Sequence, residues 1–175
     1  MFCVGQKTAA LWALLIPLAC TAPEPESVSG TPTEAEGQAT PGDLVTTWVE
    51  MWNSYDLDQV RNLFLTDDRV SYFSSEFQGV IQGFDAVLEH HEGFGFVSGG
   101  DDRATRLWVE DVTEDRFGSS AVLTGVWYFA RGGAELDTSP QRGPVTFVCV
   151  LEDGAWRFAH MNFGNYLDPV EPVGG

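Results

Sequence analysis

The chain has 175 residues, and its 26 acidic side chains outnumber nine lysines and arginines, for a formal net charge of −17. An acidic surface repels phosphate backbones and anionic lipid headgroups, so the composition speaks against nucleic acid as a partner and against polybasic attachment to a membrane. The length accommodates one ordinary domain and little more.

The first 19 residues have the layout of a secretory signal peptide. Lys7, the only lysine of the chain, precedes a mostly apolar stretch from Thr8 to Ala19. A membrane-spanning helix needs roughly 20 apolar residues, and this stretch ends sooner, at Cys20. We therefore expect residues 1–19 to be removed on export.

The end of this segment, Ile16-Pro17-Leu18-Ala19-Cys20, resembles the lipobox of bacterial lipoproteins. The resemblance implies that Cys20 becomes the lipid-modified first residue of a protein anchored in the bacterial cell envelope, facing the periplasm or the exterior. Pro17 stands where leucine is usual, so cleavage after Ala22, which would leave a secreted soluble protein, is the alternative. In either case Cys149 is left as a single thiol in an apolar run, and we expect it to be buried and free.

Residues 20–42 are rich in Pro, Glu and Thr and carry almost no large aliphatic side chains, so we expect a disordered tether behind the anchor. The folded domain is predicted to span residues 43–175. Apolar residues at three- and four-residue spacing predict a helix over 43–54, and Asp56 has the character of an N-cap for a second short helix that begins at Leu57 and is ended by Asp67 and Asp68. Gly83 is expected to open a third.

The second half of the chain changes to the period and composition of strands. Four strands are predicted, over 105–113, 120–130, 145–151 and 155–163, with a short earlier one at 70–73. Asp153-Gly154 is typical of a tight hairpin turn, and residues 139–144 are expected in a longer loop. Three helices followed by this meander predict an α+β fold, a curved antiparallel sheet packed on three N-terminal helices.

Three motifs in this order carry a family resemblance: Asp67-Asp68, the Gly-x-x-Ala-x-x-x-His-His-x-x-Phe helix of residues 83–94, and Asp153-Gly-x-Trp-Arg followed by His160-x-Asn162. Over about residues 43–166 the chain resembles the SnoaL-like branch of the nuclear transport factor 2-like superfamily. The resemblance implies a cone-shaped α+β roll (cystatin-like) that encloses a pocket, and a homodimer through the sheet. Its members include both enzymes and non-catalytic domains, so the family does not fix the function.

Candidate site residues follow from the expected strands and helices. Strict alternation in the last strand would place Trp156, Phe158, His160 and Asn162 on one face, and the resemblance implies that this face is the concave one. His160 or His91 would then be the proton carrier, with Asp56 as the nearest carboxylate partner. His90 is expected at the edge or in solvent. Ligand contacts are assigned to a set of aromatic and amide side chains: Trp52, Tyr72, Trp127 and Asn162.

Neither a metal ion nor a cofactor is predicted. The adjacent His90 and His91 point about 100° apart on a helix and cannot chelate one ion as an i, i+4 pair would, and adding Glu76, Glu89 or His160 gives no diagnostic ligand spacing.

Two functions remain open. Ketosteroid-isomerase-like members of the superfamily use an aspartate at the position that Phe73 occupies, so that chemistry would need Glu76 to swing in. This favours a lipid-anchored module with a hydrophobic pocket for a small apolar ligand, or for assembly, without catalysis. The alternative is a small general acid-base enzyme of isomerase, dehydratase or cyclase type.

Overall fold

The computed structural model describes residues 39–132 and 140–167. The predicted signal peptide, Cys20 and most of the predicted tether lie outside these residues. The helices are α1 (Pro41–Ser54), a 3-10 helix η1 (Leu57–Gln59), α2 (Val60–Leu63) and α3 (Phe84–Gly93). The strands are β1 (Ser71–Phe73), β2 (Ile81–Gln82), β3 (Thr105–Phe117), β4 (Ser120–Arg131), β5 (Gln141–Glu152) and β6 (Ala155–Phe163).

Helix α1 begins two residues before the predicted Asp43. Thr40 is its N-cap: the hydroxyl of Thr40 accepts from the backbone N–H of Asp43 at 3.1 Å, and the carboxylate of Asp43 accepts from the backbone N–H of Thr40 at 2.8 Å. The hydrogen bonds that the backbone N–H and the hydroxyl of Thr40 donate to the carboxylate of Asp43 lower the pKa of Asp43. The helix ends at Tyr55, which has a left-handed backbone with φ of 53°. Trp48 and Trp52, one turn apart, lie on its buried face.

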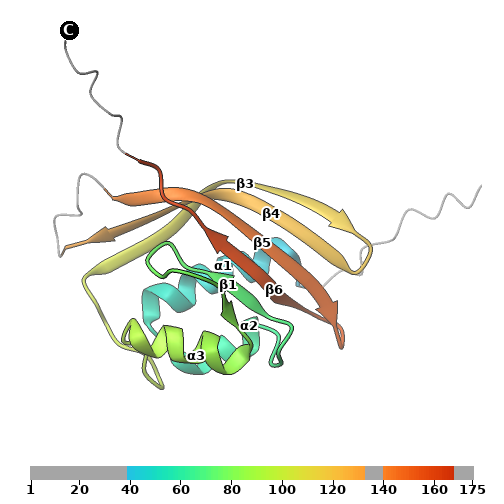
Figure 1. Ribbon diagram of the computed structural model, residues 1–175, viewed down its shortest axis with the longest axis horizontal. Helices are drawn as coiled ribbons and strands as arrows, with labels where there is room; N and C mark the ends of the chain where they lie inside the picture. Colours follow the sequence, from blue (N-terminus) through green and yellow to red (C-terminus); the bar gives the residue numbers. More distant parts are fainter. Residues whose placement is uncertain (1–38, 133–139, 168–175) are drawn as a thin grey trace, which may run out of the picture. The chain divides into compact units, whose positions relative to one another are not determined.

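The six strands form one sheet in the order β2-β1-β6-β5-β4-β3, and the helices lie on one face of it (Figure 1). The predicted meander of β3 to β6 and the α+β class are confirmed. The sheet is mixed rather than purely antiparallel, because β1 pairs with β6 in parallel. Strand β5 begins at Gln141, inside the stretch expected as a loop, because residues 141–144 pair with β4. Gly143 also lets the backbone of Gly164 approach closely.

The hairpin between β5 and β6 turns at Asp153 and Gly154, whose φ angles of 50° and 79° confirm the predicted turn. Further along this pair the register shifts: Phe158 lies opposite Cys149, whereas His160 lies opposite Val148. Ala159 is therefore the extra residue of a β-bulge, and the side chains that follow it change faces. The bulge decides where His160 points.

The core lies between α1, α3 and the sheet and is rich in aromatic rings. The ring of Trp48 is 5.4 Å from that of Phe147 and 5.5 Å from that of Phe163, which ties α1 to β5 and β6. Cys149 is fully buried and free, as predicted. In the part of the chain that the structure describes, no helix has the length and apolar character needed to cross a membrane.

Candidate functional site

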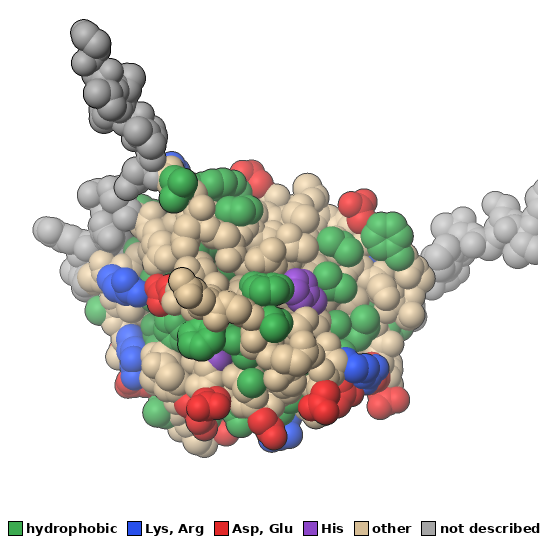
Figure 2. Space-filling model, in the orientation of Figure 1, with side chains coloured by type: hydrophobic (Ala, Val, Ile, Leu, Met, Phe, Trp, Pro, Cys, Tyr) green, Lys and Arg blue, Asp and Glu red, His purple; other side chains and the backbone are tan. Residues whose placement is uncertain are grey.

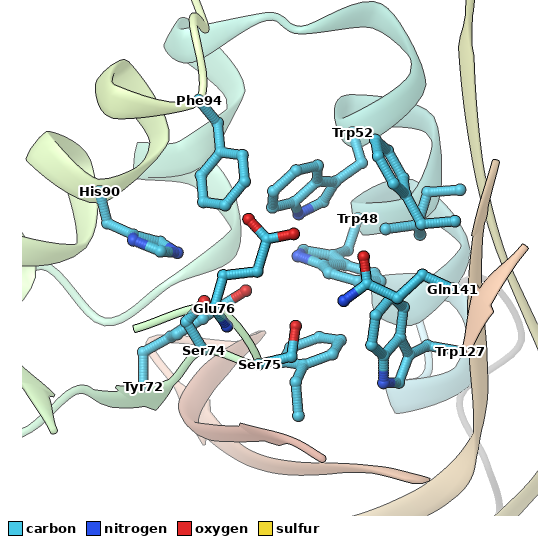
Figure 3. Close-up of a pocket in the computed structure, with 13 residues that line it drawn as sticks. Trp48, Trp52, Tyr72, Ser74, Ser75, Glu76, His90, Phe94, Trp127 and Gln141 are labelled. Atoms are coloured by element: carbon cyan, nitrogen blue, oxygen red, sulfur yellow. Dashed lines mark hydrogen bonds between the residues drawn. The ribbon is translucent and has the colours of Figure 1, made fainter. Parts of the chain in front are cut away.

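An inner pocket lies between α1, α3, strand β1 with the segment after it, and the strands β3 to β6 (Figure 3). Its volume is about 40 Å³. The lining is mainly aromatic: Trp48, Trp52, Tyr72, Ser74, Ser75, Glu76, His90, Phe94, Leu107, Trp127, Phe129, Gln141 and Phe163. The predicted ligand contacts Trp52, Tyr72 and Trp127 are all among these residues.

Two indole N–H groups in this pocket lack acceptors. Trp48 and Trp52 are 0% and 6% exposed, and the Nε1 atom of neither has a hydrogen-bond partner among the described residues. The third tryptophan of the lining differs, because Nε1 of Trp127 donates to the carbonyl oxygen of Gly164 at 2.8 Å. Buried donors are normally paired, so the two unpaired indole N–H groups are available to an acceptor that enters the pocket.

Glu76 brings a carboxylate to the same place. Figure 3 shows its side chain reaching toward the space between Phe94 and the indole rings of Trp48 and Trp52. The backbone N–H of Glu76 donates to the hydroxyl of Ser74 at 3.2 Å, and its carboxylate lies 3.4 Å from the guanidinium of Arg131. Glu76 was named from the sequence only as the residue that would have to swing in for ketosteroid-isomerase-like chemistry, and in the structure its side chain lines the pocket.

An outer groove of about 580 Å³ adjoins the inner pocket and shares Ser74, Glu76, His90 and Phe94 with it. Its remaining lining is Phe77, Val80, Ile81, Gln82, Ala86, Glu89 and Gly93. Phe77 and Val80 are 61% and 49% exposed, so this is an open apolar surface. Figure 2 shows hydrophobic side chains across the face that carries β1 and β6, with acidic side chains along its lower edge.

His90 lines both cavities, which corrects the expectation that it faces the edge or solvent. Its ring lies 5.0 Å from the rings of Tyr72 and Phe94, and its Nε2 atom has no hydrogen-bond partner within the described ranges. Burial lowers its pKa below the usual value for histidine, so the ring is neutral near pH 7. A neutral imidazole can accept or donate one proton at this position.

His91 is fully buried but belongs to the core rather than to the pocket. Its Nδ1 atom lies 2.8 Å from the carbonyl oxygen of Val87, and because a carbonyl can only accept, Nδ1 carries the proton. Desolvation lowers the pKa of His91 to about 4. The ring packs on those of Trp52, Phe64 and Phe96. The interpretation of His91 as a pocket residue is therefore wrong, because the helix turns its neighbour His90 to the cavity instead.

His160 and Asn162 do not share the face of Trp156 and Phe158, and that prediction is wrong because of the bulge at Ala159. His160 lies on the face of the sheet away from the helices, where its Nδ1 is 2.8 Å from the hydroxyl of Ser71. Asn162 is exposed on the same face. Neither residue lines the inner pocket or the outer groove.

Asp56 serves as the predicted N-cap and not as a partner of a histidine. Its carboxylate accepts from the backbone N–H of Asp58 at 3.1 Å and from the side-chain amide of Gln59 at 3.0 Å. It lines neither cavity. In residues 39–132 and 140–167, no three His, Cys, Asp or Glu side chains are grouped to hold a metal ion.

The site thus combines unpaired indole donors, one carboxylate and one neutral imidazole within an aromatic wall. Such a set can hold an acceptor oxygen, and it can move a proton if a substrate lies within reach of Glu76 or His90. Sequence reasoning missed the role of Trp48 and the orientation of His90. The i, i+4 spacing of Trp48 and Trp52 was the available signal, because it places both rings on one face of a helix.

No family model and no curated protein matches this sequence. Among solved structures, a nuclear transport factor 2-like superfamily protein from Salmonella enterica serovar Typhimurium matches with a TM-score of 0.59 at 15% identity, over 76% of this chain and 93% of that one. A protein of unknown function from Pseudomonas putida, also nuclear transport factor 2-like, matches with a TM-score of 0.60 at 16% identity, over 76% and 92%.

A protein with a cystatin-like fold from Novosphingobium aromaticivorans matches with a TM-score of 0.57 at 13% identity, over 73% of this chain and 80% of that one. Similarity at these identities establishes the fold and no more. The chain has a nuclear transport factor 2-like fold, and its activity has to be argued from its own residues.

Proposed function

We propose that this domain binds a small, largely apolar molecule whose body lies in the outer groove and whose tip enters the inner pocket. The observation that carries the proposal is the junction of the two cavities at Ser74, Glu76, His90 and Phe94. The outer groove, at about 580 Å³, has the size of a small-molecule site, whereas the inner pocket of about 40 Å³ admits only a few atoms.

A neutral fluorescent probe, N-phenyl-1-naphthylamine, tests this proposal. Val80→Glu places a charge in the groove and is expected to weaken probe binding by at least tenfold. Val112→Glu is the matched control, because Val112 is similarly exposed, at 44%, and lines neither cavity. Equal binding by the wild type and both variants would contradict the proposal. Mass spectrometry of the purified protein would identify a ligand carried through purification.

A small acid-base enzyme is the second candidate, and the placement of Glu76 and His90 in one pocket favours it. Glu76 would take a proton from a carbon next to a carbonyl, leaving the electron pair on the carbonyl oxygen as an enolate. Hydrogen–deuterium exchange at the methyl group of 2-acetonaphthone in heavy water measures this step. Exchange that is accelerated by the wild type and lost in Glu76→Gln, with binding retained, would identify an enzyme; no acceleration would favour the binding module.

Export and lipid anchoring at Cys20 are also part of the proposal. The support is the order of Lys7, the apolar stretch and the lipobox-like segment that ends at Cys20. Cys20→Ser is expected to release the protein from the membrane fraction of a bacterial host. A variant that stays with membranes would contradict the anchor, and release of the wild type into the medium would favour the secreted alternative.

Homodimer formation through the sheet is proposed on the face opposite to the helices. Val122 and Val148 are cross-strand neighbours there, and Val126 lies further along β4. All three are half-buried within one protomer, and no helix covers this face in Figure 1. Val148→Arg is expected to reduce the mass measured by light scattering to that of one chain, while Val97→Arg, away from the sheet, should not. A monomeric wild type would contradict this proposal.

A further inference from the structure

The indole N–H groups of Trp48 and Trp52 form a pair of donors on consecutive turns of α1. Both side chains line the inner pocket, both are more than nine-tenths buried, and neither Nε1 has an acceptor among the described residues. Figure 3 shows both indole rings turned to the same space. Leaving one buried donor unpaired is destabilising, so two unpaired donors in one cavity are both free to bind an acceptor atom of a bound molecule.

The size of the pocket limits what the acceptor can be. One water molecule requires roughly 10–15 Å³ on the same measure, so the volume of about 40 Å³ admits an oxygen with one or two attached atoms and excludes an aromatic ring. The rest of a ligand would have to lie in the outer groove, which begins at His90 and Phe94.

The charges around the cavities limit the acceptor further. Glu76 lines both cavities and Glu89 lines the outer groove, whereas no lysine or arginine is among the described lining residues. Arg131 is engaged with Glu76 at 3.4 Å on the exposed side. A carboxylate ligand would be repelled by Glu76 and would meet only neutral donors, while the uncharged oxygen of a ketone, ester or amide would meet a much weaker repulsion.

We propose that Trp48 and Trp52 together hold the neutral carbonyl oxygen of the ligand, so that the site selects apolar carbonyl compounds over hydrocarbons and carboxylates of the same size. This inference rests on the proposed binding function and assigns its ligand class. Trp127 lines the same pocket but takes no part, because its N–H is already bound to Gly164.

Three naphthalenes of similar size test the proposal: 2-acetonaphthone, 2-isopropylnaphthalene and 2-naphthoate. The ketone is expected to bind about tenfold more tightly than the hydrocarbon, the difference made by one or two hydrogen bonds. In the whole chain labelled with ¹⁵N at tryptophan, the ketone should shift the indole N–H resonances of Trp48 and Trp52 downfield. The resonance of Trp127 is the internal control, because it should show no new hydrogen bond.

Trp52→Phe and Trp48→Phe remove one donor each while keeping an aromatic ring. Each is expected to weaken ketone binding about threefold and to leave hydrocarbon binding nearly unchanged, which separates the lost donor from lost packing. Trp108→Phe is the matched control, since Trp108 stacks on Tyr128 at 5.0 Å and its Nε1 donates to Glu110. The indole resonances of the wild-type protein report on the site without any substitution, so the proposal can be tested even if a variant fails to fold.

The outcomes distinguish the role of the two indole donors from the binding function itself. Equal binding of ketone and hydrocarbon, without indole shifts, would overturn the donor pair and leave the binding function standing. Tighter binding of the naphthoate would overturn the neutral ligand class. Failure of all three naphthalenes and of the neutral fluorescent probe to bind would overturn both proposals.

Discussion

The Nδ1 atom of His160 lies 2.8 Å from the hydroxyl of Ser71, on the face of the sheet that turns away from the helices. The two residues are paired in register across the parallel strands β1 and β6. Their contact joins the first strand of the domain to the last, and it keeps the imidazole away from the inner pocket.

His160→Ala is expected to leave ligand binding unchanged. The substitution removes one half-buried hydrogen bond to Ser71, so the free energy of unfolding should fall by about 1 kcal/mol. Titration with N-phenyl-1-naphthylamine and urea denaturation measure the two effects. Loss of probe binding, with a fall of no more than about 1 kcal/mol in the free energy of unfolding, would show that His160 does act on the pocket.

The error over His160 shows what the sequence could not supply. Caps and turns are local, so the N-cap at Asp56, the opening of α3 at Gly83 and the turn at Asp153-Gly154 could be predicted. The bulge at Ala159 has no local signature, because it depends on the pairing of β6 with β5. A single extra residue reverses the faces of every side chain after it.

The aromatic composition of the pocket could be predicted from the sequence, but the direction in which its histidine and glutamate side chains point could not. Trp52, Tyr72 and Trp127 were expected from their aromatic character, and all three line it. The choice between His90 and His91 depends on how α3 is rotated against the sheet, which tertiary packing decides. Glu76 lies in the segment between β1 and β2, where no helical or strand period indicates the direction of a side chain.

The buried His91 predicts a loss of stability in weak acid. Its pKa is about 4 in the folded chain, below the unfolded value of 6.5, so between these values the unfolded state binds more protons and stability falls as the pH is lowered. From pH 7 to 4.5 the loss attributable to His91 is roughly 2–3 kcal/mol. Urea denaturation of the wild type and of His91→Gln, which keeps a donor for Val87 but does not titrate, measures the difference.

His90 and His160 also have lowered pKa values, so in both the wild type and His91→Gln they make stability fall as the pH is lowered. The comparison therefore isolates His91. Parallel stability curves for the wild type and His91→Gln between pH 7 and 4.5 would show that the buried ring accepts a proton in the folded state.

Cys149 is expected to be unreactive in the folded protein. It is fully buried, and burial together with the charge of Glu114 raises the pKa of the thiol to about 12. In a Cys3→Ser, Cys20→Ser chain, an aromatic disulfide reagent should react only as fast as the protein unfolds, with a rate that rises with urea. Rapid labelling without urea, absent when Cys149 is also replaced by serine, would contradict the buried position.

Gly143 and Gly93 give a matched pair of substitutions by alanine, because an added Cβ would clash at Gly143 and would meet nothing at Gly93. A Cβ atom at Gly143 would lie 1.9 Å from the carbonyl oxygen of Gly164 and 2.6 Å from its carbonyl carbon. Both atoms are backbone, so Gly143→Ala must push the end of β6 away from β5. We expect a loss of about 2–3 kcal/mol in the free energy of unfolding.

The same displacement would disturb the inner pocket, because the carbonyl oxygen of Gly164 is the acceptor for Trp127. Gly93→Ala adds the same methyl group at the end of α3, where nothing lies within 4 Å of it. Alanine favours the helix over glycine by up to about 1 kcal/mol, so this variant should be equal to the wild type or more stable. Urea denaturation of both variants checks the contrast. A Gly143→Ala variant as stable as Gly93→Ala would mean that strand β5 can move away from Gly164 at little energetic cost.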